Sequence, residues 1–441
     1  MTSTQDPGDL LARHRAVMPS WLALYYDEPI ELVSGRGRHV TDSQGRTYLD
    51  FFGGILTTMT GYAVPEVVEA IREQAGAMLH TSTLYLIRPM VELAEQIATL
   101  SHIPDAKVFF GTSGTEANEA ALLFATQRRK SNQVLAVRNS YHGRSFAAMG
   151  VTGIRGWSAS SLSPVAISYI HHGDRSSGPF AGLADDEYFA AVAADAREVI
   201  ETTTAGDVAC FIAEPIPGVG GFLTPSDGFF TAVKGVLDDY GIPFIADEVQ
   251  TGWGRTGDTF WAIEAHDVAP DMITFAKGLG NGLAIGGVVG RGEYIDSVHA
   301  SSISTFGGNP LASAGALANL KYLLDHDLQG NARTQGARLH AGLAGIADKY
   351  ACVGEVRGKG LMAGLTLLDP LTGAASGPAA NLALNEAKQR GLLIGKGGMA
   401  GNALRIAPPL SVTAEEVDDA IGLLTDAIDA TDKALAQKGT N

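Results

Sequence analysis

Cysteine is scarce in this sequence, and long apolar runs are missing. The two cysteines, Cys210 and Cys352, lie far apart and outside any C-x-x-C pattern, so the sequence indicates neither a disulfide framework nor a structural zinc site. A run of about 18 apolar residues, the length of a membrane span, does not occur, and the N-terminal segment lacks the apolar stretch of a secretory signal. We therefore expect a protein of a reducing compartment, the cytoplasm, without a membrane segment.

Positive charge is also in short supply. The chain has 32 basic and 48 acidic residues, a formal net charge of -16, whereas proteins that bind nucleic acid normally present a basic surface. The neighbouring His171 and His172 lack a third ligand at a usable spacing, so no metal site is predicted. These shortages exclude nucleic acid and membranes as main partners and favour small molecules.

The sequence is rich in short apolar runs separated by amphipathic stretches between about residues 107 and 290. This rhythm predicts an α/β fold with a doubly wound, mainly parallel sheet. The runs are KVFFG, VLAVR, AISYI, VACFIAEP, PFIADEV, MITFA and GGVVG. Because 441 residues exceed what one simple core usually supports, a second, smaller domain is expected.

The pattern changes after about residue 315 to helices mixed with short strands, and a last helix opens at Thr413 and Glu416 with a capping-box pattern. We expect a large domain over residues 61–315 and a smaller α+β domain over residues 316–441. The first 60 residues, with a hairpin-like GRHVTDSQGRTYLDF, are predicted to form an N-terminal arm that packs with the smaller domain.

Two charged residues follow apolar runs where a sheet of this kind binds ligands. Asp247 ends the run in IPFIADEVQTGWGR, at the carboxyl edge of the predicted sheet. Lys277 follows the run in PDMITFAKGLGNG, and the glycines after it let a ligand approach the backbone. A lysine at a strand end is usually a solvated surface group. Lys277 is therefore a candidate catalytic residue only because of the motifs around it.

Those motifs supply what chemistry with pyridoxal phosphate (PLP) requires. Ser113, Gly114 and Thr115 precede an Ala-rich helix, whose N-terminal N–H groups can bind a phosphate. Tyr141 in NSYHGRS can stack on a pyridine ring. Asp247 can keep the ring nitrogen protonated, so that the ring acts as an electron sink.

With these motifs in one order, the chain resembles the class III (ω-amino acid) aminotransferases of PLP fold type I. The matching segments are GTSGTEANEAALLFA, SYHGRS, FIAEPIPGVGGF, FIADEVQTGWGRTG, PDMITFAKGLGNG, STFGGNPLASA and LRIAPPL. The sequences of these segments are most similar to those of alanine:glyoxylate aminotransferases of the second type and of 4-aminobutyrate aminotransferases.

The resemblance implies cofactor roles for individual residues. Lys277 would hold the cofactor as a Schiff base and move the proton during transfer. Asp247 would pair with the ring nitrogen, and Gln250 would bind the ring 3-hydroxyl. The phosphate would be held by the Ser113 segment and by Thr305 of a neighbouring subunit, which implies a homodimer that could assemble further into a tetramer.

The resemblance also implies substrate roles. Arg405 would bind the α-carboxylate of an amino or 2-oxo acid, because a planar guanidinium binds carboxylate with two hydrogen bonds. Glu214 would neutralise Arg405 when an ω-amino donor is bound. Arg144 would take a distal carboxylate, and Ile55 would line the pocket, where ornithine enzymes have tyrosine.

One segment departs from the family pattern. The family's usual G-H-x-H-P is here Gly-Tyr-Ala-Val-Pro, so Tyr62 and Val64 replace two histidines near the mouth of the pocket. In addition, alanine:glyoxylate enzymes of the second type commonly lack an arginine at the Arg144 position. The exact amino donor therefore stays open.

The predicted function is a ping-pong transfer of an amino group from an ω-amino acid or alanine to 2-oxoglutarate, pyruvate or glyoxylate. A PLP-dependent aminomutase, racemase or decarboxylating relative is the alternative, and a catalytically silent binding protein on the same scaffold is a weaker one.

The residues 252–257 also fit G-x-G-x-x-G, the pattern of a dinucleotide-binding turn, but the segment after them lacks the apolar face of a phosphate-binding helix. His142, beside Tyr141, is expected to shape the pocket rather than to act as a catalytic acid or base.

Overall fold

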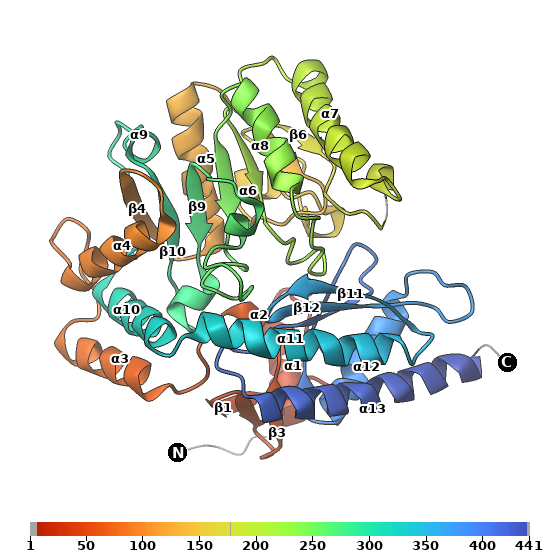
Figure 1. Cartoon of the computed structure of the whole chain (residues 1–441). Coiled ribbons are helices and arrows are strands. Elements are labelled where there is room, and N and C mark those ends of the chain that lie inside the picture. Colours follow the sequence, from red (N-terminus) through yellow and green to blue (C-terminus); the bar gives the residue numbers. More distant parts are fainter. Residues whose placement is uncertain (1–6, 177, 439–441) are drawn as a thin grey trace.

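The computed structural model describes residues 7–176 and 178–438, and its central element is a seven-stranded sheet (Figure 1). The strand order is β4-β10-β9-β8-β7-β5-β6. The strands β5 to β9 pair in parallel, and β10 runs antiparallel to both of its neighbours. Their bounds are β4 (Ala106–Gly111), β5 (Gln133–Val137), β6 (Ala166–Ile170), β7 (Cys210–Ala213), β8 (Phe244–Asp247), β9 (Met272–Phe275) and β10 (Gly286–Arg291). Each of the seven apolar runs forms one strand, which confirms the predicted α/β fold with a mainly parallel sheet.

Helices cover both faces of this sheet. One face packs on α5 (Gly114–Arg129), and its core includes Ile212 and Ile245. The alternate residues Phe211 and Phe244 belong to the core of the other face, with α7 (Asp185–Thr203) and α8 (Phe229–Asp239). Burial on both faces is the reason why the strands read as unbroken apolar runs.

Two four-stranded sheets form the lower part of the molecule in Figure 1. The first joins β1 (Leu32–Arg36), β2 (His39–Asp42), β3 (Thr47–Asp50) and β13 (Leu392–Leu393), and the second joins β11 (Val353–Lys359), β12 (Met362–Leu367), β15 (Ala403–Ile406) and β14 (Gly395–Gly397). The parallel pairing of β13 with β3 ties the N-terminal hairpin to the C-terminal part of the chain. The predicted domain boundaries stay a prediction.

The remaining helices pack around these sheets. They are α1 (Pro7–Val17), α2 (Gly53–Leu56), α3 (Pro65–Ala77), α4 (Arg88–Ser101), α6 (Phe146–Gly150), α9 (Gly292–Ile295), α10 (Pro310–Asp325), α11 (Leu328–Ala347), α12 (Gly377–Gln389) and α13 (Ala414–Lys438). Four short 3₁₀ helices are η1 (Arg155–Trp157), η2 (Gly178–Phe180), η3 (Ala262–His266) and η4 (Lys277–Gly280). The capping box before α13 is confirmed, because Thr413 N–H donates to Glu416 and Glu416 N–H donates to the Thr413 hydroxyl.

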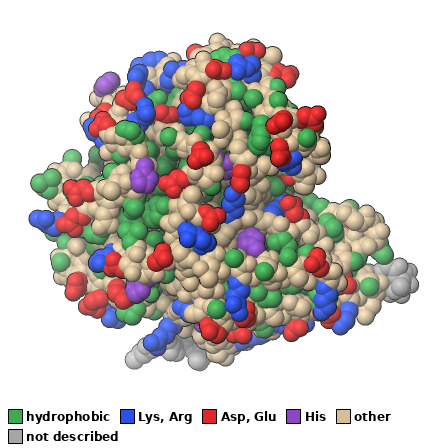
Figure 2. All heavy atoms as spheres, in the orientation of Figure 1, with side chains coloured by type: hydrophobic (Ala, Val, Ile, Leu, Met, Phe, Trp, Pro, Cys, Tyr) green, Lys and Arg blue, Asp and Glu red, His purple; other side chains and the backbone are tan. Residues whose placement is uncertain are grey.

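The outer surface mixes charges of both signs. Figure 2 shows acidic and basic side chains interspersed over the visible face, with hydrophobic side chains exposed between them. Within residues 7–176 and 178–438, none of the helices has both the length and the apolar content needed to span a bilayer.

The short segment α2 has a backbone that the sequence did not predict. Its residues Gly53, Gly54, Ile55 and Leu56 have φ angles of 53°, 60°, 67° and 62°, so the segment is a left-handed turn. A left-handed helical conformation costs an L-residue about 1–2 kcal/mol, because Cβ crowds the following carbonyl oxygen. For β-branched Ile55 this conformation is a true outlier, which requires the surrounding structure to hold it.

Candidate active site

The predicted site residues gather at the carboxyl edge of the seven-stranded sheet. Tyr141 follows β5, Glu214 follows β7, Asp247 ends β8 and Lys277 follows β9. These four strands are parallel, so their carboxyl ends meet at one edge, where open α/β sheets bind ligands. Asp247 is paired in register with Thr274, three residues before Lys277.

Lys277 starts η4 in a left-handed conformation, with φ 41°, and is half buried. Burial lowers the pKa of its ammonium group and the Arg405 charge lowers it further, whereas the Asp247 and Glu214 carboxylates act in the opposite direction. A lowered pKa makes the neutral amine more available, and only the neutral amine is a nucleophile. Lys277 therefore has the properties of a reactive lysine.

Asp247 is buried and held by three donors. Asn118 donates to its Oδ2 at 2.8 Å, His142 Nδ1 lies 2.7 Å from the same oxygen, and the N–H of Val249 donates to Oδ1 at 3.1 Å. His142 thus orients this carboxylate, in line with the structural role expected for it. Sequence reasoning missed Asn118, although a buried amide in an Ala-rich helix was a usable signal.

The N-terminus of α5 opens beside this carboxylate. The Ser113 hydroxyl caps the helix by accepting from the N–H of Glu116 at 3.2 Å. The N–H groups of Gly114 and Thr115 lie in the first turn, where a helix offers no backbone acceptor. Gly143 approaches closely, because a Cβ there would lie 2.7 Å from the Thr115 hydroxyl. This arrangement suits an anion such as phosphate.

Glu214 is buried at the same edge and is held by backbone donors. The N–H of Tyr141 donates to Oε1 and the N–H of Gly218 donates to Oε2, both at 2.8 Å. Burial raises the pKa of Glu214 to about 7, and the Asp247 charge adds to the increase. The Tyr141 ring lies edge-on to Trp157, with ring centroids 5.4 Å apart.

Arg405 reaches the site from β15 in the second small sheet. Its guanidinium lies 5.2 Å from the Phe52 ring and 4.7 Å from the Phe222 ring, and burial lowers its pKa to about 10. Its Nη2 donates to Gln250 Oε1 at 2.7 Å. The buried cation is thus paired with a neutral amide and faced by two aromatic rings.

Two expected roles concern the loaded site and stay predictions: Glu214 neutralising Arg405 when an ω-amino donor is bound, and Gln250 binding the ring hydroxyl. The two oxygens of Glu214 accept from the backbone N–H groups of Tyr141 and Gly218, and the oxygen of Gln250 accepts from Arg405. These buried acceptors thus have partners within the chain, as buried polar groups require.

Three further predicted residues are exposed. Ile55 is 49% exposed on the left-handed turn, and α2 contacts η4. The exposed Arg144 lies over the ring of Trp21, 5.6 Å from its centroid, and sequence reasoning missed Trp21. Thr305 is exposed in the loop before α10.

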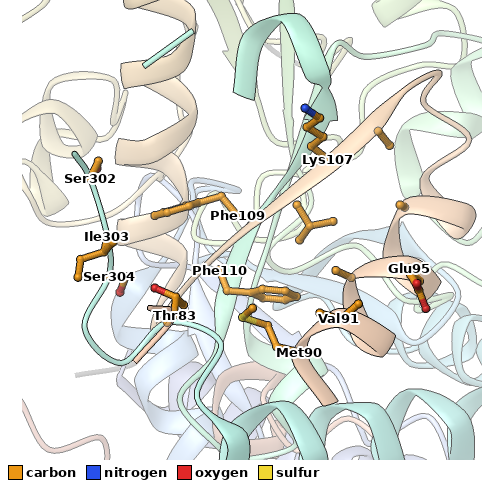
Figure 3. A pocket seen from close by; sticks show the side chains of 15 residues that line it. Thr83, Met90, Val91, Glu95, Lys107, Phe109, Phe110, Ser302, Ile303 and Ser304 are labelled. Carbon is orange, nitrogen blue, oxygen red and sulfur yellow. The ribbon is translucent and has the colours of Figure 1, made fainter. Parts of the chain in front are cut away.

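A cavity of about 540 Å³ lies between α4, β4 and the loop 302–307 (Figure 3). Its wall is largely apolar, with Met90, Val91 and Phe110 facing the space, while Lys107 and Glu95 lie toward its rim. The cavity lacks the cluster of ionisable groups that the sheet edge carries.

The structure agrees with the sequence argument against a dinucleotide-binding turn at residues 252–257. This segment forms consecutive turns and is followed by the short 3₁₀ helix η3 rather than by a long helix that could bind a pyrophosphate. Within residues 7–176 and 178–438, no group of three His, Cys, Asp or Glu side chains is placed to hold a metal ion.

Comparisons with known proteins agree with this geometry. The family model for class-III aminotransferases matches residues 25–428. The chain is 38% identical over 415 residues to the mitochondrial alanine–glyoxylate aminotransferase 2 homolog 2 of Arabidopsis thaliana, with 93% of this chain and 84% of that protein covered. It is 34% identical over 441 residues to the 5-aminovalerate aminotransferase DavT of Pseudomonas aeruginosa, with 97% and 99% covered. The (S)-enantioselective omega-transaminase of Thermomicrobium roseum superposes with a TM-score of 0.89 at 31% identity, with 97% and 99% covered.

Proposed function

The chain belongs to the class-III aminotransferases, and from this premise we propose that it transfers an amino group from an ω-amino acid or alanine to a 2-oxo acid. The acceptor is 2-oxoglutarate, pyruvate or glyoxylate, and the two half-reactions alternate in a ping-pong mechanism. The observation that carries the proposal is the placement of Lys277, Asp247 and the N-terminus of α5 at one sheet edge.

The enzyme depends on pyridoxal 5'-phosphate, and the residues at this edge fit it. When bound, the cofactor supplies an aldehyde that takes up the amino group and a ring that withdraws electrons. The N–H groups of Gly114 and Thr115, with the Ser113 segment, would bind the phosphate. Asp247, which is fixed by two side-chain donors, would pair with the ring nitrogen, and the Tyr141 ring would pack against the pyridine.

Lys277 carries the chemical step. Its lowered pKa supports covalent attachment of the cofactor through the neutral amine. The same amine would hold and move the proton at the α-carbon of the amino donor.

Arg405 and Gln250 form the carboxylate site. An α-carboxylate that accepts two hydrogen bonds from Arg405 displaces the amide of Gln250, which is then free to bind the ring hydroxyl. The Glu214 carboxylate lies near enough to Arg405 to raise the pKa of its guanidinium. It offsets the Arg405 charge when a donor without an α-carboxylate is bound. Arg144 takes the distal carboxylate of a long substrate, and Ile55 lines the apolar part of the pocket.

The active unit is proposed to be a homodimer, in which Thr305 of one subunit completes the phosphate site of the other. Ser304, next to Thr305, hydrogen-bonds Glu116 in the first turn of α5, so the loop starts close to the phosphate site. Large apolar side chains are exposed around it, among them Leu86 (99%), Leu84, Tyr85, Ile303 and Phe306. Such a surface supports an interface with a second copy of the chain.

Two further properties are part of the proposal. Residues 61–315 form the large domain, and residues 316–441 with the N-terminal arm form the smaller one, in agreement with the pairing of β3 with β13. The two cysteines are free and buried, which supports a cytoplasmic location.

An aminomutase, a racemase or a decarboxylating enzyme is the alternative, because such enzymes need the same lysine and carboxylate. The absorption spectrum of the purified protein with a panel of amino donors separates the two. Conversion of the cofactor band by particular donors, reversed by a 2-oxo acid and absent in Lys277→Ala, is the expected result. Turnover without any 2-oxo acid would favour the alternative, and a protein without bound cofactor would contradict both.

A further inference from the structure

The left-handed turn of α2 is tied at both of its ends to one side chain, Tyr62. The Tyr62 hydroxyl donates to Asp50 Oδ2 at 2.6 Å, and the other oxygen of Asp50 accepts from the N–H groups of Phe52 at 2.9 Å and Gly53 at 3.0 Å. The side chain of Thr58, at the other end, hydrogen-bonds the same hydroxyl. Tyr62 therefore links the entry of the turn to its exit.

The Tyr62 ring is itself fixed by its surroundings. Its backbone exchanges two hydrogen bonds with Gly37, of 2.7 and 2.9 Å. Gly35 makes room for the ring, because a Cβ at that position would lie 2.7 Å from two ring atoms. Gly35 and Tyr62 thus form a matched pair, in the segment where this chain departs from the family's histidines.

The turn that Tyr62 secures lies on the substrate side of the site. Phe52 at its entry packs on the guanidinium of Arg405, and α2 contacts η4, which begins at Lys277. Ile55 has the φ of 67° that a β-branched residue avoids, and it is half exposed. A strained conformation of this kind persists only when neighbouring groups hold it.

We propose that Tyr62 is a positioning residue for the amino donor: through Asp50 it holds the left-handed turn and so fixes how closely Ile55 and Phe52 approach the substrate. The inference rests on the proposed function and deepens it, because this turn then sets the preferred chain length between the amino and carboxylate groups of the donor. A hydroxyl is required at residue 62, or another donor that reaches Asp50.

Steady-state kinetics of the holoenzyme test the role of the hydroxyl, with alanine, β-alanine, 4-aminobutyrate and 5-aminovalerate as donors. In Tyr62→Phe we expect the KM of the best donor to rise about two- to tenfold, as for the loss of one hydrogen bond, with kcat and cofactor content unchanged and the donor ranking altered. Tyr62→His keeps an N–H donor and should recover most of the change. Unaltered KM values for every donor in Tyr62→Phe would overturn the inference.

Tyr48→Phe is the matched control. Tyr48 is a buried tyrosine of β3, the strand that ends at Asp50, and its hydroxyl donates to Asp42 at 2.8 Å. Its loss removes an equivalent tyrosine–aspartate bond away from the turn, so it should lower the melting temperature without changing the donor ranking. A ranking altered as much in Tyr48→Phe as in Tyr62→Phe would overturn the specific role of Tyr62.

Thermal unfolding of Ile55→Gly gives a readout that does not depend on activity. Ile55→Ala is the reference, because both variants lack the Ile side chain and only glycine adopts the left-handed conformation without strain. Ile55→Gly should therefore melt at a higher temperature than Ile55→Ala, and both should discriminate less among donors. A melting temperature of Ile55→Gly at or below that of Ile55→Ala would overturn the inference. If the wild type transfers an amino group from no donor, the proposed function itself fails, and the melting temperature still reports on the turn.

Discussion

The proposed cofactor side and the proposed substrate side of this site are built in different ways. The cofactor side uses the ends of neighbouring strands in one sheet, and its central carboxylate, Asp247, is fixed by Asn118 and His142. The substrate side joins Phe52 and Ile55 from the N-terminal part with Arg405 from the C-terminal part, and it includes a strained turn.

With these proposed roles, the groups that carry out the reaction are held apart from the groups that select the substrate. A paired sheet edge gives the reactive groups a rigid support, as the shared chemistry requires. Loops and turns from distant parts of the chain can change without disturbing that edge. We therefore expect substitutions on the cofactor side to lower kcat for every substrate, and substitutions on the substrate side to change KM for particular substrates.

The largest effect is expected for Lys277→Ala. Loss of the proton-transferring amine should lower kcat on the order of 10⁴-fold, the upper range for general acid–base catalysis, and should do so for every donor. Stopped-flow measurement of the first half-reaction checks this expectation. Lys321→Ala, on the exposed face of α10, is the control and should retain full activity. A donor that reacts at the normal rate in Lys277→Ala would remove this lysine from the mechanism.

Asp247→Asn should have the next largest effect. It removes the charge at the cofactor side with little change of shape, and we expect kcat to fall about 10²- to 10³-fold, the range for loss of one preorganised electrostatic group. The fall should be equal for ω-amino donors and alanine. Asp271→Asn, a matched control, changes a carboxylate that accepts from the N–H of Phe244 at the opposite end of β8. A donor-dependent loss in Asp247→Asn would break the proposed division of roles.

Arg405→Lys tests the substrate side. It keeps the positive charge but removes the two-pronged geometry, so the KM of the 2-oxo acid should rise about 10- to 100-fold, as for a lost charge-assisted hydrogen bond of about 1.5–3 kcal/mol. The first half-reaction with a donor that lacks an α-carboxylate should change little. Equal losses in both half-reactions would indicate that Arg405 supports the fold rather than the carboxylate.

The smallest effect concerns pH. Because the pKa of Glu214 is raised to about 7, its carboxyl is neutral below this pH and charged above it. The charged form offsets Arg405, so the KM of the 2-oxo acid should rise about two- to fivefold between pH 6 and pH 8, as for a partly screened charge pair of about 0.5–1 kcal/mol. In Glu214→Gln this dependence should disappear, whereas a persisting dependence would assign it to another group.

The sequence by itself determined the seven strands and the positions of the reactive residues at the ends of these strands. Each strand is a local apolar run, and Asp247 and Lys277 stand at the ends of such runs, so neighbouring residues carry the signal. The parallel arrangement then brings these ends to one edge without any further information. The family motifs, the fold class and the cofactor could be predicted for the same reason.

Only the tertiary structure decided how the polar groups are paired. The hydrogen bond from Arg405 to Gln250 joins residues 155 positions apart, and the one from Asn118 to Asp247 joins residues 129 positions apart. No local sequence pattern can therefore predict either of them. The left-handed turn at Ile55 also opposes local preference, since a β-branched residue favours extended backbone. Such a conformation depends on distant partners such as Tyr62, and competition among buried donors and acceptors is settled only when the chain has folded.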